Sequence, residues 1–425
     1  MSYAELNHAE LSALKQSLEQ EYARHCAKEL SLNMARGKPA AAQLELSLPL
    51  LDAVDASSSL FAEDGTDCRN YGVMDGIPEA KRLMAAIMDH DPSNVCVFGN
   101  SSLNIMYDLV SHGFLHGYLG NSPWRELDGV SWLCPVPGYD RHFAITELLG
   151  IKMIPIRMDE NGPDMDEIEA LVRKDDTIKG IWCVPQYSNP GGVTYSDETV
   201  DRLASMPCAA PDFRIFWDNA YCVHHLYETR QAHVVDIAEA CEKAGNPNRY
   251  FKFASTSKVT FPGAGIAAVA ASEDNIAEIK KRVGIQTVGY DKLNQLRHVR
   301  FFKDLQGVRA HMEKHAAIIR PKFELVARML EEGLEETGCA SWSNPDGGYF
   351  ISFEGLPNTA KRTVSLAKAA GVTMTGAGAT WPYKNDPEDS NIRIAPTLPP
   401  LEELEAAMEV FVCCAKLAAV ESLLV

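Results

Sequence analysis

Short apolar runs alternate with amphipathic stretches between about residues 80 and 272, and this alternation constrains the fold more than any other feature. Apolar runs bounded by turn residues are typical of buried strands, and the stretches between them have helical spacing. Such an order implies βαβ units, in which helices cover both faces of a mainly parallel sheet. Seven strands are predicted, at residues 95–98, 131–136, 152–158, 178–184, 213–218, 250–255 and 265–272.

The remainder of the chain predicts a second, smaller domain. A length of 425 residues exceeds what one hydrophobic core usually serves. Helical spacing dominates from about residue 275 to 336, and two further strands precede a closing helix. We expect an α/β chain with a large domain over residues 51–300 and a small α+β domain over 301–425, which the N-terminal helix and segment of residues 1–50 join.

The charge balance argues against two classes of partner. The chain carries 58 acidic and 40 basic residues, a net charge of −18, so it lacks the basic surface that nucleic acids and anionic membranes require. No signal peptide or membrane-spanning apolar run is expected. The 11 cysteines are scattered without a C-x-x-C pair, which is typical of reduced thiols in a cytoplasmic protein.

Polar residues directly after the predicted strands are candidates for a ligand site, because open parallel sheets bind ligands beyond the carboxyl ends of their strands. "GNSSLN" (99–104) opens a helix, where free N–H groups and the Ser101 and Ser102 hydroxyls suit a phosphate. A plain serine N-cap is the alternative. Tyr139 could stack on a flat ligand or simply pack, and Asn189 stands in a Pro-Gly-rich turn that also suits a purely structural asparagine.

A carboxylate and a lysine follow two further strands. Asp218 ends the apolar run "FRIFWD", where a buried carboxylate is costly unless it meets a cation, although a helix N-cap would also explain it. Tyr221 follows three residues later. Lys258 comes after the strand at 250–255 in "STSK", where a lysine with a lowered pKa could attack a carbonyl; alone, it would be read as a surface lysine.

Together these features match the needs of pyridoxal 5'-phosphate (PLP). Its aldehyde requires an amine, its phosphate an anion site, and its pyridine nitrogen a carboxylate. With "NPGG", "DNAY" and "STSK" in this order, almost the whole chain resembles the fold-type I, PLP-dependent class I aminotransferases. It is most similar to the divergent bacterial branch of aspartate aminotransferases related to the aminotransferase domains of MocR-type regulators.

The resemblance implies a role for each position. Lys258 would carry the cofactor covalently and act as general acid and base, and Asp218 would keep the pyridine nitrogen protonated. Tyr221 and Asn189 would hydrogen-bond the phenolic oxygen, and Tyr139 would stack on the ring. The phosphate would be held by Asn100, Ser101, Ser102 and Ser255, together with Tyr71, which would reach across to the site of the partner subunit in a homodimer.

The resemblance also implies how substrate binds. Arg393, in "NIRIAP", would hold the substrate α-carboxylate with both arms of its guanidinium, beside Asn189 and the backbone at Gly37. We expect ping-pong transamination between aspartate and 2-oxoglutarate, without a metal. A distal carboxylate needs a second cation, and four candidates stay open: Arg36, Lys38, Lys292 and Arg297.

Some points stay open at this stage. Alanine, aromatic or 2-aminoadipate donors, or β-elimination on the same scaffold, are alternatives to aspartate transamination. The family often carries a phosphate-binding arginine about eight residues after the lysine, where this chain has Ile266.

Two further motifs favour other functions less well. "GAGIAA" matches a dinucleotide-binding fingerprint, but it leads into a predicted strand rather than a helix. His311 and His315 lie one helical turn apart, as do His112 and His116. We interpret these pairs as exposed or helix-capping residues rather than zinc ligands, because the glutamate between His311 and His315 does not directly follow the first histidine.

Overall fold

One sheet forms the large lobe of the structure, a computed structural model that describes residues 2–425. Its five central strands, in the order β8-β7-β6-β3-β4, are parallel, and β9 is antiparallel to its neighbours β2 and β8. All seven predicted strands are confirmed, and the unpredicted hairpin strand β5 extends the β4 edge. The strands span Val95–Val97 (β2), Ser131–Val136 (β3), Lys152–Asp159 (β4), Gly162–Pro163 (β5), Ile178–Cys183 (β6), Arg214–Asp218 (β7), Tyr250–Ser255 (β8) and Ala267–Ala271 (β9).

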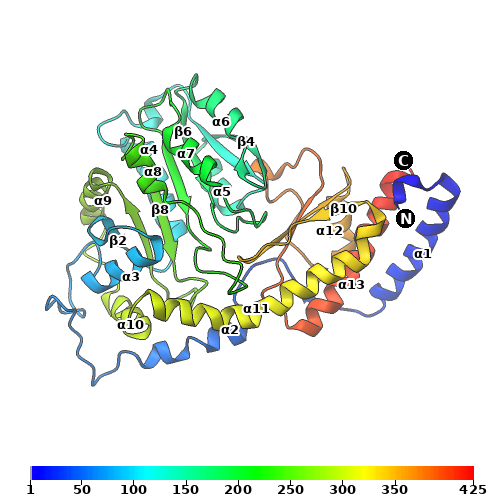
Figure 1. Ribbon diagram of the computed structural model, residues 1–425, viewed down its shortest axis with the longest axis horizontal. Helices are drawn as coiled ribbons and strands as arrows, with labels where there is room; N and C mark the ends of the chain where they lie inside the picture. The colour runs from blue at the N-terminus through cyan, green and yellow to red at the C-terminus, as the bar shows by residue number, and fades with distance from the viewer. Residues whose placement is uncertain (1) are drawn as a thin grey trace.

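Helices cover both faces of this sheet (Figure 1). Successive side chains of a strand point to opposite faces, so in β3 Trp132 joins one core and Leu133 the other. One core contains α4 (Ser102–His116), α5 (Asp140–Leu148) and α9 (Glu273–Gln286). The other contains α6 (Met165–Val172), α7 (Asp197–Ser205) and α8 (Ile237–Lys243), while α3 (Pro78–Met88) and α10 (Lys292–Phe302) cover the β2–β9 edge.

Side-chain caps set where many helices begin. The cap oxygen accepts a hydrogen bond from a backbone N–H of the first turn, which would otherwise lack a partner. Such caps are Asn7, Asp164, Ser196, Asp236, Ser272, Asp291 and Asp304. Ser101, at the start of α4, makes no such bond; the Asn104 N–H donates to the Ser101 carbonyl, and the N–H groups of Ser102 and Leu103 stay available.

The second lobe combines C-terminal elements with the N-terminus. A three-stranded antiparallel sheet contains β10 (Ala340–Trp342), β11 (Ile351–Gly355) and β13 (Asn391–Ile394). Helices α1 (His8–Cys26), α11 (Leu305–Leu334) and α12 (Ala360–Ala369) pack against α13 (Leu401–Leu423). Strand β1 (Leu32–Asn33) pairs with β12 (Val372–Thr373), and the chain then passes through α2 (Ala41–Glu45) towards the large lobe. Helix α11 runs along both lobes (Figure 1).

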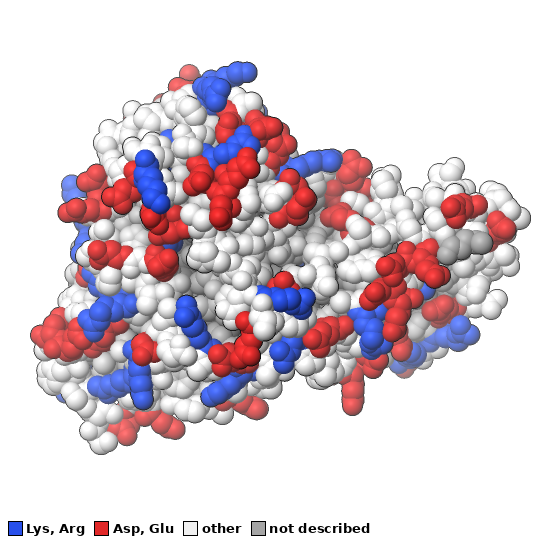
Figure 2. Space-filling view, in the orientation of Figure 1, with Lys and Arg blue, Asp and Glu red and all other residues white. Residues whose placement is uncertain are grey.

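The surface agrees with the charge balance. Acidic and basic side chains are interspersed on the face shown in Figure 2, and no continuous basic stripe crosses it. Within residues 2–425, no helix combines the length and the apolar character needed to cross a lipid bilayer.

A buried ion pair joins the amino ends of two central strands. Lys179 of β6 donates to Asp212, just before β7, at 2.8 Å, and Trp124 donates its indole N–H to the other Asp212 oxygen at 2.7 Å. All three side chains are buried. Removing one partner of such a buried ion pair destabilises the fold, because the remaining charge is left without compensation.

We predict that Asp212→Ala lowers the free energy of unfolding by about 3–5 kcal/mol, because it leaves the buried Lys179 ammonium without its carboxylate partner. The double variant Lys179→Met/Asp212→Leu removes both charges and should recover most of that loss. Urea denaturation followed by tryptophan fluorescence measures both. A double variant as unstable as Asp212→Ala would contradict the ion-pair explanation.

Candidate active site

The structure brings most of the predicted site residues to the carboxyl edge of the sheet. Lys258 lies three residues beyond the end of β8 and is half-buried, and its Nζ is 4.9 Å from the centre of the Tyr221 ring. Burial lowers the pKa of Lys258; the negative charge of Asp218 opposes this change and the positive charge of Arg393 adds to it. A lysine with a lowered pKa has more of its amine uncharged at neutral pH, which is the form that attacks carbonyl carbon.

Asp218 closes β7 as a buried carboxylate, 3% exposed. One oxygen, Oδ2, accepts a hydrogen bond from Nε2 of His142 at 3.0 Å, and the His142 ring stacks on Trp182. The other oxygen, Oδ1, is buried and has no hydrogen-bond partner among the described residues. A buried carboxylate oxygen without a donor is costly, so this position fits a ligand that presents a positively charged N–H group. The protonated pyridine nitrogen of PLP is such a group.

Three further predicted residues lie near this carboxylate or near its partner His142. Tyr221 is buried, its hydroxyl makes no hydrogen bond within the described chain, and burial raises its pKa well above the usual value. The Tyr139 ring lies edge-on to His142, and burial raises the pKa of Tyr139 to about 12. Tyr139 and Asn189 line the same small cavity. These neutral groups can donate hydrogen bonds to a ligand oxygen and contact a flat ring.

The start of α4 fits a phosphate better than a plain serine cap. Neither the Ser101 nor the Ser102 hydroxyl makes a hydrogen bond within the described residues, and a cavity of about 400 Å³ opens beside Gly99 and Ser101. Free N–H groups at a helix start, with hydroxyls beside them, bind anions well. Ile266, at the place of the usual arginine, is buried in the core beneath β9 and supplies no charge.

Asn100 links the start of α4 to the loop that carries the lysine. Its side-chain amide donates to the Pro262 carbonyl at 2.8 Å, and its own carbonyl accepts from the Ser257 hydroxyl at 2.7 Å. The Ser255 hydroxyl accepts a long bond of 3.4 Å from the Ser257 N–H. Of the predicted phosphate ligands, Asn100 therefore has its side chain already engaged, whereas Ser101 and Ser102 are free.

Arg393 reaches the site from β13 of the other lobe. Its Nη1 donates to Asp140 at 2.9 Å and to Asn189 at 3.3 Å, and its guanidinium lies 4.9 Å above the Phe350 ring. Its Nε is buried without a hydrogen-bond partner among residues 2–425. The arginine is thus fixed in place and still has a donor for a carboxylate. The pairing with Asp140 was not predicted.

Gly37 lies against the Phe350 ring on which Arg393 rests. A Cβ at this position would come within 2.5 Å of the Phe350 ring, so any side chain would displace the ring that supports Arg393. Thr375 ties this segment in place, because it donates to the Ala35 carbonyl at 2.6 Å and accepts from Arg393 at 3.4 Å. The N-terminal segment therefore borders the place where Arg393 would hold a substrate.

The four candidates for a second cation differ in their surroundings. Lys292 is buried and donates to the Gly72 carbonyl at 2.9 Å, which occupies its ammonium. Arg297 is half-buried, with its Nε lacking a partner among the described residues. Arg36 and Lys38 are exposed and flank Gly37, which packs against the Phe350 ring beneath Arg393.

Tyr71 lies on a projecting loop. Its side chain is 83% exposed, and residues 53–77 contain no helix or strand and extend from the large lobe (Figure 1). A large aromatic side chain held in water by an extended loop has no packing role within its own subunit.

Several functional neighbours were missed at the sequence level. Two of them, His224 and Tyr349, both lie 3.4 Å from the backbone carbonyl of Lys258 and flank its side chain. A third, His142, could have been suspected because it follows Tyr139 by one helical turn. Gln43 donates to the Tyr349 hydroxyl at 3.0 Å, which connects the N-terminal segment to this cluster.

The prediction that His311 and His315 are exposed or helix-capping is wrong. Both are buried on the inner face of α11, 3.1 Å apart, where His311 contacts the Val259 carbonyl and His315 contacts Gln43. Burial lowers the pKa of both histidines, to about 3 for His315, so the pair is neutral. They join α11 to the loop after Lys258.

Comparisons with known proteins agree with this geometry. The family model for aspartate amino-transferase matches residues 6–425. An aspartate aminotransferase of Corynebacterium glutamicum is 47% identical over 395 residues, which cover 93% of this chain and 91% of the relative.

Solved structures show the same relationship. The crystal structure of an aspartate transaminase from Corynebacterium glutamicum superposes with a TM-score of 0.97 at 44% identity, covering 100% of this chain and 99% of that one. The α-aminoadipate aminotransferase LysN of Thermus thermophilus shares the fold, with a TM-score of 0.72 at 20% identity and 95% coverage of both chains. The chain therefore belongs to the aspartate aminotransferase family of fold-type I, PLP-dependent aminotransferases.

Proposed function

We propose that this aminotransferase moves the amino group of aspartate to 2-oxoglutarate in two half-reactions at the site around Lys258. The observation that carries this proposal is the buried, unpartnered Oδ1 of Asp218, in the same cluster as a lysine of lowered pKa and a carboxylate-binding arginine. When bound, PLP supplies a carbonyl carbon that receives the amino group and a protonated ring that withdraws electrons from the substrate.

The side chains of this chain divide the remaining work. Lys258 holds the cofactor and then carries a proton from and to the reacting carbon, for which its lowered pKa is suited. His142 fixes the orientation of Asp218 and leaves Oδ1 free, where it would hold the protonated ring nitrogen. Tyr221 and Asn189 would donate to the phenolic oxygen, and Tyr139 would stack on the ring. Arg393 binds the substrate α-carboxylate in place of its present partner Asp140.

We further propose that the phosphate lies at the start of α4. Ser101, Ser102 and Ser255 would contribute hydroxyls, and Asn100 would hold the adjoining loop in position. Tyr71 would complete the phosphate site of a second subunit, which makes the functional unit a homodimer. The exposure of Tyr71 on an extended loop supports this arrangement.

The distal carboxylate of aspartate requires a further cation, for which Arg36 or Lys38 is best placed beside Gly37. The Corynebacterium glutamicum relative carries the name aspartate aminotransferase, which favours aspartate over alanine, aromatic or 2-aminoadipate donors. β-Elimination on the same scaffold is the alternative reaction. It would release ammonia from a single substrate without a requirement for a 2-oxo acid.

We expect Asp218→Ala to lower kcat by at least about a hundredfold, because an unopposed ring nitrogen no longer stays protonated. The protein should stay folded, since the substitution also removes a buried charge. Steady-state kinetics with aspartate and 2-oxoglutarate measures the loss, and circular dichroism checks the fold. Near-normal turnover in a folded Asp218→Ala protein would contradict the role given to this carboxylate.

Cation substitutions should separate aspartate from alanine as donors. If Arg36 holds the distal carboxylate, Arg36→Met lowers kcat/KM for aspartate by about ten- to a hundredfold and leaves alanine unaffected, because only aspartate loses a charge-assisted bond. Lys38→Met is the matched control on the other side of Gly37. The same measurement on Arg297→Met tests the third free candidate. Equal losses for both donors would rule out a distal-carboxylate role for the residue replaced.

The pKa of Lys258 should respond in opposite directions to two substitutions. Arg393→Met raises it, because a nearby positive charge disfavours the ammonium, whereas Asp218→Asn lowers it, because an opposing negative charge is lost. The pH dependence of Lys258 acetylation in cofactor-free protein, quantified by peptide mass spectrometry, reports both shifts. Shifts in the same direction would contradict this account of the lysine.

A further inference from the structure

Four buried side chains connect the N-terminal segment with the backbone of Lys258. Each of them is at most 5% exposed, and none is a proposed catalytic residue. They are Gln43 of α2, Tyr349 just before β11, and His311 and His315 of α11. We call these four residues the Gln43 network.

The amide group of Gln43 is the junction of the network. Its oxygen accepts a hydrogen bond from the Ala40 N–H at 2.9 Å, which fixes the direction of the amide. Its Nε2 donates to the Tyr349 hydroxyl at 3.0 Å and lies 3.0 Å from Nδ1 of His315. A primary amide has two N–H donors, so these two contacts occupy both of them.

Two branches lead from this amide to consecutive peptide carbonyls. The first passes through Tyr349, whose hydroxyl lies 3.4 Å from the carbonyl of Lys258. The second passes through His315 and His311, which are 3.1 Å apart, and reaches the carbonyl of Val259 at 2.9 Å. A single side chain from the N-terminal segment thus bears on the two peptide groups that follow the reactive lysine.

Tyr349 also flanks the amine of Lys258. The lysine Nζ lies 6.0 Å from the centre of the Tyr349 ring and 4.9 Å from the centre of the Tyr221 ring. The two rings are 6.0 Å apart and inclined by 28°, so the amine lies beside a pair of stacked rings. The placement of the Tyr349 ring therefore affects the room that the amine has, and the Gln43 amide holds the hydroxyl of that ring.

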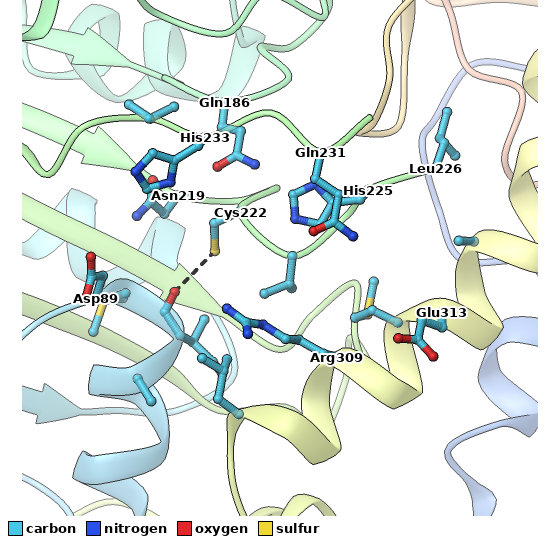
Figure 3. Close-up of a pocket in the computed structure, with 18 of the residues that line it drawn as sticks. Asp89, Gln186, Asn219, Cys222, His225, Leu226, Gln231, His233, Arg309 and Glu313 are labelled. Atoms are coloured by element: carbon cyan, nitrogen blue, oxygen red, sulfur yellow. Dashed lines mark hydrogen bonds between the residues drawn. The ribbon is translucent and has the colours of Figure 1, made fainter. Parts of the chain in front are cut away.

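The other neighbour of the Lys258 carbonyl is held by fewer contacts. His224 Nε2 also lies 3.4 Å from this carbonyl, but its Nδ1 is buried without a partner in the described chain. A cavity of about 740 Å³ lies behind the segment that carries His224, and Figure 3 shows Cys222 and His225 at its border. The Tyr349 side is therefore better suited to fix the carbonyl.

We propose that Gln43 is a positioning residue for transamination, which holds the backbone of Lys258 through Tyr349 and the α11 histidines and so directs the lysine amine. This inference rests on the proposed role of Lys258. A displacement of about 1 Å can lower the rate of an enzyme about a hundredfold. If the backbone loosens, the amine also gains contact with water, and its pKa, which burial lowers, should rise towards the ordinary value.

Two substitutions interrupt the network at different points. Gln43→Met removes the amide and keeps a side chain of similar length, whereas Tyr349→Phe removes only the hydroxyl. Each should lower kcat of the holoenzyme by about ten- to a hundredfold, because the amine is less well placed. KM for aspartate should change by less than about threefold, because the proposed contacts of the substrate carboxylates stay in place.

Tyr118→Phe is the matched control. Tyr118 is a fully buried tyrosine whose hydroxyl donates to the Leu109 carbonyl at 2.6 Å, so the substitution removes a comparable hydrogen bond elsewhere. Its kcat should stay close to that of the unaltered enzyme. A loss of kcat as large as that of Tyr349→Phe would assign the effect to general destabilisation and overturn the proposal.

The double variant tests whether the two residues act together. Gln43→Met already interrupts both branches, so kcat of Gln43→Met/Tyr349→Phe should be close to that of Gln43→Met alone. A loss equal to the product of the two single losses would overturn the proposal, because it would mean that the residues act independently.

The pH dependence of Lys258 acetylation in cofactor-free protein provides a readout that needs no turnover. Its midpoint should move to higher pH in Gln43→Met and Tyr349→Phe but not in Tyr118→Phe. Unchanged midpoints in variants that circular dichroism shows to be folded would overturn the proposal, and Tyr349→Phe alone decides if Gln43→Met does not fold. Failure of aspartate as a substrate would contradict the proposed function and leave this readout unaffected.

Discussion

Burial of the Asp218 carboxylate at the end of β7 is the constraint around which the site is organised. A negative charge in this position is tolerated only if both oxygens find donors. His142 satisfies one, and it is itself held by stacking on Trp182 of the neighbouring strand. The second oxygen is left for a ligand. The same charge acts on Lys258, whose pKa would otherwise fall further in its half-buried position.

The site is completed by groups that lie far apart in the sequence. Asp218 and Lys258 come from neighbouring strands of the large sheet, whereas Arg393 and Phe350 come from the small lobe. The N-terminal segment connects the two. It contacts Phe350 through Gly37, and Gln43 joins Tyr349 to the buried histidines of α11. A relative movement of the lobes would therefore change the distance between the arginine and the lysine.

Sequence patterns were sufficient for features that depend on local order and insufficient for those that depend on packing. The strands were found because buried strands leave apolar runs, and Lys258, Asp218 and Tyr139 could be placed at the sheet edge because each ends or follows a strand. His142, Asp140 and Tyr349 were missed, since nothing local shows which face of a helix or strand meets the site. For the same reason His311 was placed at the surface although it is buried. The two-residue strand β5 is too short to leave a pattern.

If Arg393 holds the substrate carboxylate as proposed, its contact with Asp140 affects how acids leave the site. A buried guanidinium ordinarily releases a bound carboxylate slowly, because its charge would then be left uncompensated. Here a carboxylate of the protein stands ready to take the vacated place. Departure thus becomes an exchange of one anion for another, which favours rapid turnover over tight retention. Such a carboxylate within the protein suits an enzyme that must release one acid before it binds the next.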